Sequence, residues 1–218
     1  MINNRLNDSI VEREIGKFLD GHLYNDKEIF SEFARTNDRE NQFNGSDLIL
    51  SSSDGRLYRA VVDEKVAARY ANRGLNSFSL ELSFIDRGGN KHCGWFTDMS
   101  KRTEYYLFGW LNKVDIPFIK EQGRYDTDKI RAENIRELEY CLVSKKKILD
   151  FLEARGWTLE KLGRQDARIR ENGFVKTNKF IDDVSFRYSP NYIEQPINLL
   201  LKKETYIKLS SHHGILKE

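Results

Sequence analysis

Two β-prone runs on either side of Asp54-Gly55 constrain the fold of this chain more than any other feature. The first run begins at Asp47 and reads Asp-Leu-Ile-Leu, and the second extends from Leu57 to Val66. An Asp-Gly pair between such runs is a strong signal for a hairpin turn, because turns of this kind need a left-handed backbone that glycine adopts at low cost. We therefore expect two antiparallel strands here.

Helical and strand-like patterns surround this hairpin. Apolar residues recur at helical spacing over 8–24, and a second, short helix is expected over 26–35. Alternation of apolar and polar residues predicts a strand over 76–85, followed by a turn over 86–90. A continuous apolar run over 104–111 is typical of a strand buried on both faces.

The second half of the chain begins with another helical pattern. Apolar residues recur at helical spacing from 127 to 155, where we expect one helix or two, and Gly156 is typical of a helix end. Residues 157–218 mix a short helix with strand-like pieces. The order of elements predicts an α/β protein in which residues 1–155 form the core and residues 156–218 form a C-terminal extension packed on it.

Composition limits the class of protein. The chain has 218 residues, of which 39% are hydrophobic, so it can bury the core of one large domain. Its two cysteines, Cys93 and Cys141, exclude a disulfide framework and are typical of a reducing cytoplasm. No stretch approaches the run of about 18 apolar residues that a membrane span needs, and the N-terminus lacks the apolar run of a signal peptide. We expect a soluble, cytoplasmic protein.

The hairpin carries the acidic residues with the clearest chemistry. Asp47 begins the first strand, and Asp63-Glu64-Lys65 ends the second. If the loop is Asp54-Gly55-Arg56, Asp47 lies opposite Asp63 with the side chains on one face, about 5 Å apart at Cβ. If the loop is Asp54-Gly55 alone, Asp47 pairs with Val62 and shares its face with Glu64, because a shift of one residue exchanges the faces. The turn therefore decides between Asp63 and Glu64.

This constellation suits phosphodiester hydrolysis. Carboxylates hold Mg²⁺, which polarises a phosphate and generates a hydroxide nucleophile. A nearby lysine can orient or deprotonate the attacking water and stabilise the developing charge. Asp63 and Lys65 lie two residues apart on the expected strand, so their side chains share a face. We expect Asp47 and Asp63 to bind the metal, with Glu64 as the reserve ligand and Lys65 positioning the water.

The order of these elements resembles the PD-(D/E)XK nuclease superfamily, which includes restriction endonucleases, Holliday-junction resolvases and DNA-repair nucleases. The resemblance covers about residues 8–152. Asp47 matches the first acidic position, Asp63 the second, and Lys65 the lysine; Ser46 stands where the superfamily's name has proline. The resemblance also implies that Glu12 or Glu14 matches the helix glutamate that some members add to the metal site. Gln42 lies in the loop that leads to Asp47 and resembles the approach seen in several such families.

The resemblance implies a restriction endonuclease-like mixed central sheet flanked by helices, and a Mg²⁺- or Mn²⁺-dependent nuclease acting on DNA in defence, restriction or repair. It also implies a homodimer by analogy. Charge agrees with a phosphate-facing surface: residues 140–180 carry 10 Lys/Arg against 5 Asp/Glu, whereas residues 1–65 carry 9 against 13. The residues expected to contact DNA are Gln42, Lys145, Lys146, Lys147, Arg168 and Arg170. The alternative is a non-catalytic module on the same fold that binds nucleic acid or a protein partner.

Overall fold

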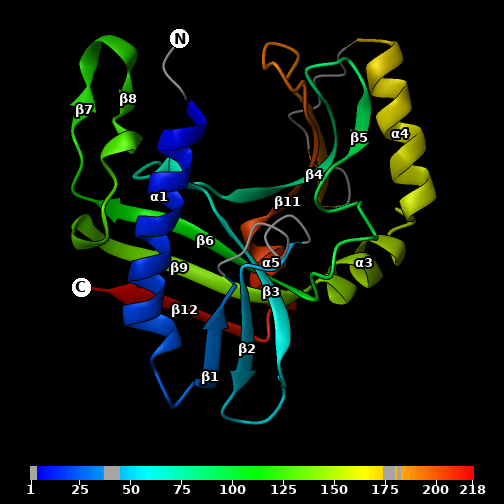
Figure 1. Cartoon of the computed structure of the whole chain (residues 1–218). Helices are drawn as coiled ribbons and strands as arrows, with labels where there is room; N and C mark the ends of the chain where they lie inside the picture. Colours follow the sequence, from blue (N-terminus) through cyan, green and yellow to red (C-terminus); the bar gives the residue numbers. More distant parts are fainter. Residues whose placement is uncertain (1–3, 37–44, 174–179, 181–182) are drawn as a thin grey trace.

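The protein is a mixed α/β structure built on a curled six-stranded sheet. A computed structural model describes residues 4–36, 45–173, 180 and 183–218 (Figure 1). The strand order is β1-β2-β3-β6-β9-β12, in which β3 and β6 are parallel and every other neighbouring pair is antiparallel. The bounds of these strands are Phe30–Arg35 (β1), Leu48–Ser52 (β2), Ala60–Val66 (β3), Tyr105–Val114 (β6), Ile135–Ser144 (β9) and His212–Lys217 (β12).

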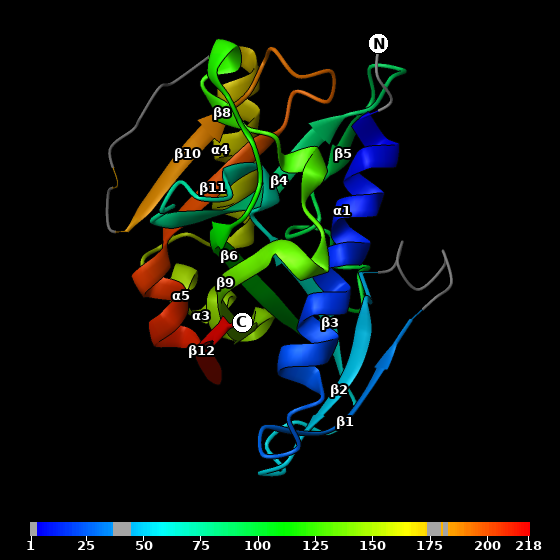
Figure 2. The same ribbon diagram turned by 90° about the vertical axis from the view of Figure 1, so that its left-hand side faces the viewer.

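A second, antiparallel sheet of four strands packs beside the first, in the order β10-β11-β4-β5 (Figure 2). Its strands are Val184–Tyr188 (β10), Ile197–Lys202 (β11), Ser77–Ile85 (β4) and Lys91–Cys93 (β5). A two-stranded hairpin, Phe118–Ile119 (β7) with Arg124–Tyr125 (β8), extends from one end of the molecule. The strand expected over 76–85 is confirmed as β4, and it belongs to this second sheet.

Four α-helices are present in the part of the chain that the structure describes. They are α1 (Asn4–Leu19), α3 (Lys145–Glu153), α4 (Leu159–Glu171) and α5 (Lys203–Leu209). α1 ends in a π-helical turn, Asp20–Tyr24, so the helix expected over 8–24 is confirmed. Figure 1 shows α1 lying across the six-stranded sheet and α4 on the outer side of the second sheet.

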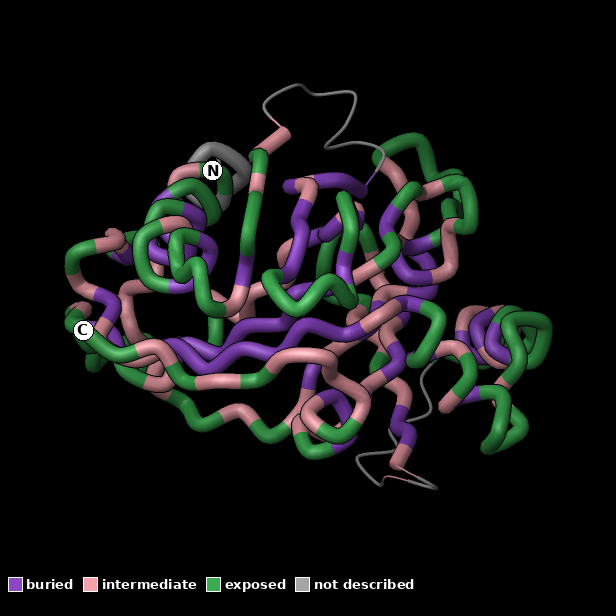
Figure 3. The backbone as a smooth tube through the Cα atoms, turned by 90° about the horizontal axis from the view of Figure 1, so that it is seen from below, coloured by how far each residue is buried: buried purple, intermediate pink, exposed green. Residues whose placement is uncertain are grey.

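The central strands β6 and β9 are buried on both faces, which explains their continuous apolar runs. Alternate residues of β6 and β9 enter two different cores. Leu107, Leu138 and Leu142 pack with Val11, Ile15 and Phe18 of α1 on one face. Tyr106, Phe108, Trp110, Cys141 and Val143 pack with β4, β11 and the other three helices on the opposite face. Figure 3 shows the same strands as a continuous buried layer.

Two of the expected helices are wrong. Residues 127–155 contain two short 3₁₀ turns and the strand β9, and α3 begins only at Lys145. β9 is buried on both faces, so its apolar residues follow no two-residue alternation and fall at helical spacing by coincidence. Residues 30–35 form β1, an edge strand paired with β2.

Residues 156–218, expected as an extension packed on the core, contribute strands to both sheets. β12 pairs with β9 at the edge of the six-stranded sheet, and β11 pairs with β4 in the second sheet. Across the described residues, no helix is long and apolar enough to cross a membrane.

Candidate active site

The acidic residues of the hairpin line a groove of about 940 Å³. α1 forms one wall, with Glu12, Gly16 and Asp20 along it. The ends of β2 and β3 form the floor, and Phe78 and Ser79 of β4 lie on the opposite side. The groove therefore lies where the two sheets and the N-terminal helix meet.

The register of β2 and β3 decides which acid accompanies Asp47. Leu48 pairs with Val62 and Leu50 with Ala60, so the next position in this register sets Asp47 opposite Asp63. This is the register expected from a three-residue loop, although the strands are joined by the longer segment 53–59. The observed register is thus one of the two alternatives that the sequence left open, and the segment that joins the strands is longer than either expected loop.

Asp47 and Asp63 form a close pair of carboxyl groups. Oδ2 of Asp47 accepts a hydrogen bond of 2.7 Å from the backbone N–H of Glu64, which holds the carboxyl group against β3. Burial raises the pKa of Asp47 to about 7, and the charge of Asp63 and a hydrogen bond between the two carboxyl groups act in the same direction. Asp63 is only 4% exposed. Two crowded carboxylates of this kind favour a bound cation or a shared proton.

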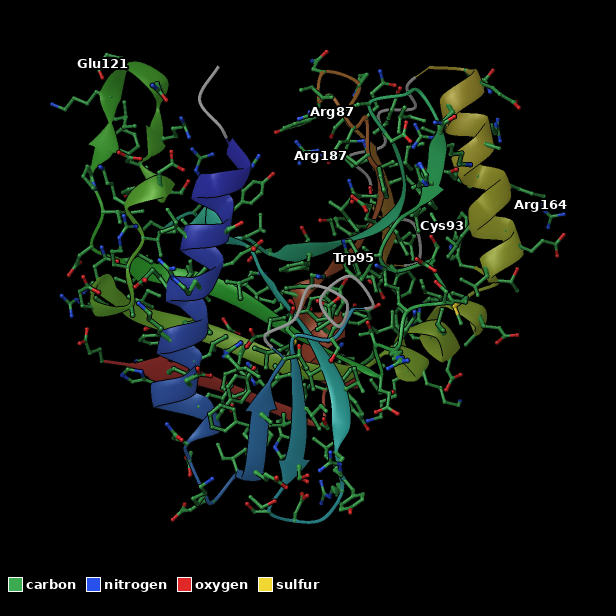
Figure 4. All side chains as sticks on the ribbon, in the orientation of Figure 1. Arg87, Cys93, Trp95, Glu121, Arg164 and Arg187 are labelled. Atoms are coloured by element: carbon green, nitrogen blue, oxygen red, sulfur yellow. The ribbon has the colours of Figure 1, made fainter. Side chains whose placement is uncertain are left out.

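Lys65 shares the face of Asp63, as predicted. Its Nζ lies 2.5 Å from Oδ1 of Asp63 and 5.2 Å from the centroid of the Trp95 ring. Burial acts to lower the pKa of Lys65, but the charges of Asp63 and Asp47 outweigh it and the pKa lies above its ordinary value. The ammonium is thus held charged beside the acid pair. Figure 4 shows Trp95 beside β4, near the end of β3.

Glu64 also lines the groove, but its side chain lies on the opposite face of β3 from Asp63 and contacts Tyr24 and Arg35. Its carboxylate accepts a hydrogen bond of 2.7 Å from the hydroxyl of Tyr24 and one of 2.8 Å from Nη1 of Arg35. The same guanidinium donates from Nε to both carboxylate oxygens of Asp20 at 2.9 Å and from Nη2 to the carbonyl of Gly16 at 3.0 Å. Glu64 and Arg35 therefore tie β3 and β1 to α1, and the role of Glu64 as a reserve ligand stays a prediction.

The two helix glutamates are separated by the structure. Glu12 lines the groove, and its charge contributes to the raised pKa of Lys65. Glu14, which the sequence offered as a metal ligand, accepts hydrogen bonds from Lys17 at 2.7 Å and from the backbone N–H of Ala132 at 3.4 Å, and it does not line the groove. Glu12 is therefore the helix glutamate that the geometry brings to the site.

The residues expected to contact DNA lie in different places. Lys145 is only 6% exposed and donates to the carbonyl of Asp98 at 3.2 Å; burial lowers its pKa, and the nearby charges of Asp98 and Asp63 oppose that shift. Lys146 pairs with Asp150 at 2.6 Å, and Lys147 donates to the carbonyl of Leu209 at 3.3 Å.

Arg168 and Arg170 do not line the groove. Arg168 is exposed on α4. Arg170 of the same helix is held by Oγ of Ser83 at 2.5 Å and by the carbonyl of Gln195 at 3.3 Å, so its guanidinium is structural. Gln42 lies outside the described residues. Among the residues expected to contact DNA, Lys145 interacts electrostatically with Asp63.

Two further residues belong to the site and were not assigned to it from the sequence. Trp95 supports the ammonium of Lys65. Glu81 of β4 is near enough to interact electrostatically with Lys65; burial raises the pKa of Glu81, while the backbone N–H of Trp95 and the charge of Lys65 act against that rise. No local sequence pattern predicts either residue as part of the site. Both come from β4 and the segment after β5, which are placed beside the groove by the packing of the second sheet.

The donor set suits a hard cation that keeps most of its water. Asp47 and Asp63 offer carboxylate oxygens, and Mg²⁺ is usually bound in proteins by one or two carboxylates together with water and substrate phosphate. Across the described residues, no three His, Cys, Asp or Glu side chains are grouped closely enough to enclose a metal by themselves. The pair is therefore compatible with an open magnesium site and not with a closed structural one.

The sequence matches no model of a protein family, and neither a curated protein nor a solved structure matches the chain.

Proposed function

We propose that the protein is a Mg²⁺-dependent nuclease that hydrolyses DNA phosphodiester bonds on a PD-(D/E)XK, restriction endonuclease-like core. One observation carries the proposal: the carboxyl groups of Asp47 and Asp63 are hydrogen-bonded to each other, and Nζ of Lys65 lies 2.5 Å from Asp63, in a groove that all three residues line. The order of Asp47, Asp63 and Lys65 along the chain and their closeness in the fold both support this proposal.

Asp47 and Asp63 are the residues that would hold the metal. When bound, Mg²⁺ supplies charge that polarises the phosphate and lowers the pKa of a coordinated water. The backbone N–H of Glu64 fixes the direction of the Asp47 carboxylate, so this ligand is oriented before substrate binds. Glu12 lies on the facing wall of the groove.

Lys65 orients the attacking water and stabilises the charge that develops on the phosphate. Its pKa is raised, so it acts in the protonated form, as a donor and not as the base that removes the proton. Trp95 holds the ammonium from the other side. The mobile lysine side chain is thereby confined to the face on which the reaction takes place.

The test is incubation of the purified protein with supercoiled plasmid and with labelled branched and linear DNA, in Mg²⁺, Mn²⁺ or EDTA. We expect metal-dependent cleavage that Lys65→Ala reduces by about 100-fold or more, the usual effect of removing one group that stabilises transition-state charge. Lys113→Ala is the matched control, since Lys113 is exposed on β6 away from the groove. Equal cleavage by the Lys65 variant and the wild type contradicts the role given to Lys65.

The second candidate is a non-catalytic binding module on the same fold. The direct ion pair between Lys65 and Asp63 favours it, because it partly neutralises the carboxylate that a metal would use. Calorimetry separates the two candidates: a nuclease binds Mg²⁺ or Mn²⁺ in a manner that Asp47→Asn abolishes, whereas a binding module shows no such dependence. Absence of cleavage of every DNA form by folded protein overturns the nuclease proposal.

A further inference from the structure

A second cavity, of about 600 Å³, lies next to the groove. It is lined by the end of the loop 53–59, by Met99 and by the first turn of α3. Thr103 lines this cavity and Gly45 lines the groove, and Oγ1 of Thr103 donates to the carbonyl of Gly45 at 2.7 Å. The two cavities therefore share a wall at this contact.

The loop 53–59 holds an aromatic ring in solvent. Tyr58 is 84% exposed, and Met99 at the rim of the same cavity is 58% exposed. Burying a tyrosine is favourable, and a ring left so exposed on a surface lined by other apolar groups is typical of a contact site.

The backbone of this loop is fixed although the ring is exposed. Leu57, next to Tyr58, is buried. Its N–H donates to Oγ of Ser52 at 2.9 Å, and its carbonyl accepts from the N–H of Ser52 at 3.0 Å. Arg59 donates from its backbone to Oγ of Ser51 at 3.0 Å and adopts a left-handed backbone, with φ of 49°. A non-glycine residue rarely adopts this conformation, so the surrounding contacts hold it in place. The ring is thus presented at little further cost in backbone entropy on binding.

The cavity is basic. Arg56, Lys145 and Lys146 line it, against one carboxylate in the lining, Glu104, whose Oε2 accepts from the backbone N–H of Val61 at 2.9 Å. The ion pair of Arg56 with Asp54 and that of Lys146 with Asp150 are exposed to solvent, and such pairs contribute little. Both cations can therefore exchange these partners for a phosphate.

The basic cavity leads to the acid pair. Lys145 lines the cavity, and its charge interacts with Asp63. Ala60, also in the lining, precedes Asp63 on β3 by three residues, about 10 Å of extended strand. A DNA strand with one phosphate at Asp47 and Asp63 can thus continue into the basic cavity.

From these features we infer that the surface formed by the loop 53–59 and the first turn of α3 binds an unpaired stretch of the cleaved DNA strand. Tyr58 stacks on a base, while Arg56 and Lys146 contact phosphates. Aromatic stacking combined with a basic track is how proteins bind single strands without reading their sequence. This inference rests on the proposed function, and it names the form of DNA that the site prefers: DNA with an unpaired flank rather than blunt duplex.

The test is fluorescence anisotropy in EDTA with a labelled single-stranded thymidine oligonucleotide and a blunt duplex of the same length. We expect Tyr58→Ala to weaken binding of the single strand by roughly fivefold to a hundredfold, the usual loss when one stacking ring is removed. Tyr58→Phe retains the ring and should bind as the wild type does. Tyr192→Ala is the matched control, since Tyr192 is 59% exposed and lines neither cavity.

Binding of the blunt duplex should be the same for the wild type and Tyr58→Ala, because a paired base is not free to stack on the ring. Equal binding of the single strand by these two proteins overturns the inference. The result is independent of the proposed function, which is judged by cleavage in Mg²⁺ and not by binding in EDTA. If the wild type cleaves DNA but Tyr58→Ala binds single strands as tightly as the wild type, the nuclease proposal stands and the single-strand-binding surface is wrong.

Discussion

The carboxylate of Asp47 accepts a hydrogen bond of 2.7 Å from the backbone N–H of Glu64. This contact joins the first acidic residue to the strand that carries the second, and it directs Asp47 toward Asp63 while the Glu64 side chain occupies the other face. The side chains of neighbouring residues on β3 therefore lie on opposite faces of the sheet. Asp63 faces Asp47, and Glu64 contacts Arg35, which in turn binds α1 at the wall of the groove.

The first prediction compares these neighbours. Asp63→Asn should reduce metal-dependent cleavage by about 100-fold or more, because it removes a charged metal ligand. Glu64→Gln should retain cleavage, because Glu64 contacts Tyr24 and Arg35 and does not face the acid pair. The check is the initial rate on plasmid DNA at saturating Mg²⁺, with folding verified by circular dichroism. If Glu64→Gln loses as much activity as Asp63→Asn, the assignment of faces is wrong.

The second prediction concerns pH. The pKa of Asp47 rises from about 4 in the unfolded chain to about 7 in the fold, so the folded state holds the proton more tightly. The stabilisation is complete below about pH 4 and is lost between about pH 4 and 7 as the group ionises. Without metal, the free energy of unfolding should fall across that window by on the order of 1–3 kcal/mol.

Asp47→Asn should remove this fall, since the amide does not titrate. Urea unfolding at several pH values in EDTA measures it for both proteins. Parallel pH profiles for the wild type and the variant would show that the crowding of the acid pair contributes nothing to stability.

The third prediction concerns Arg35, which joins β1, α1 and β3. Arg35→Met should lower the free energy of unfolding by about 2–4 kcal/mol, because it leaves Glu64 and Asp20 without their shared cation in a partly buried site. Arg56→Met is the matched control: the Arg56 side chain is 74% exposed, and its loss should cost less than about 0.5 kcal/mol. Urea unfolding measures both. A similar loss of unfolding free energy in the two variants would contradict the inference that Arg35 joins β1, α1 and β3.

The fourth prediction uses two glycines with the same backbone conformation. Gly45 and Gly55 both have φ of 74°. A Cβ at Gly55 meets open space, so Gly55→Ala should cost only the left-handed strain of about 1–2 kcal/mol. A Cβ at Gly45 would lie 2.4 Å from Oγ1 of Thr103, so Gly45→Ala should cost more and also displace Asp47, two residues away.

Stability and cleavage together check this pair. Gly45→Ala should be the less stable variant and should lose activity, whereas Gly55→Ala should keep the activity of the wild type. Equal effects of the two substitutions would show that the contact between Gly45 and Thr103 does not position the site.

The site was more predictable than the fold around it. Asp47, Asp63 and Lys65 could be placed on one face from the sequence, because strand alternation and hairpin register are local rules. The same rules left Glu64 as an alternative, and only the observed register of β2 and β3 excludes it. Arg35 could not be predicted, since its partners Asp20 and Glu64 are brought to it by the packing of α1 on the sheet.

The errors in the fold have a common cause. β9 was expected as a helix because a strand buried on both faces and a buried helix share the same apolar composition. β1 was expected as a helix because an edge strand with five partly or fully exposed residues shows little alternation. In both cases the pairing partner decides the conformation, and that partner lies elsewhere in the chain.

β4 carries one side of the groove, and the strand that supports it, β11, comes much later in the chain. Between them the chain forms β6 and β9, two central strands of the six-stranded sheet, whose edge is completed later by β12. Pairings between such distant segments slow folding, because the entropy of closing a long loop is lost before the contacts form. The acid pair thus depends on segments that are close in the sequence, whereas the groove around it depends on pairings between segments that are far apart.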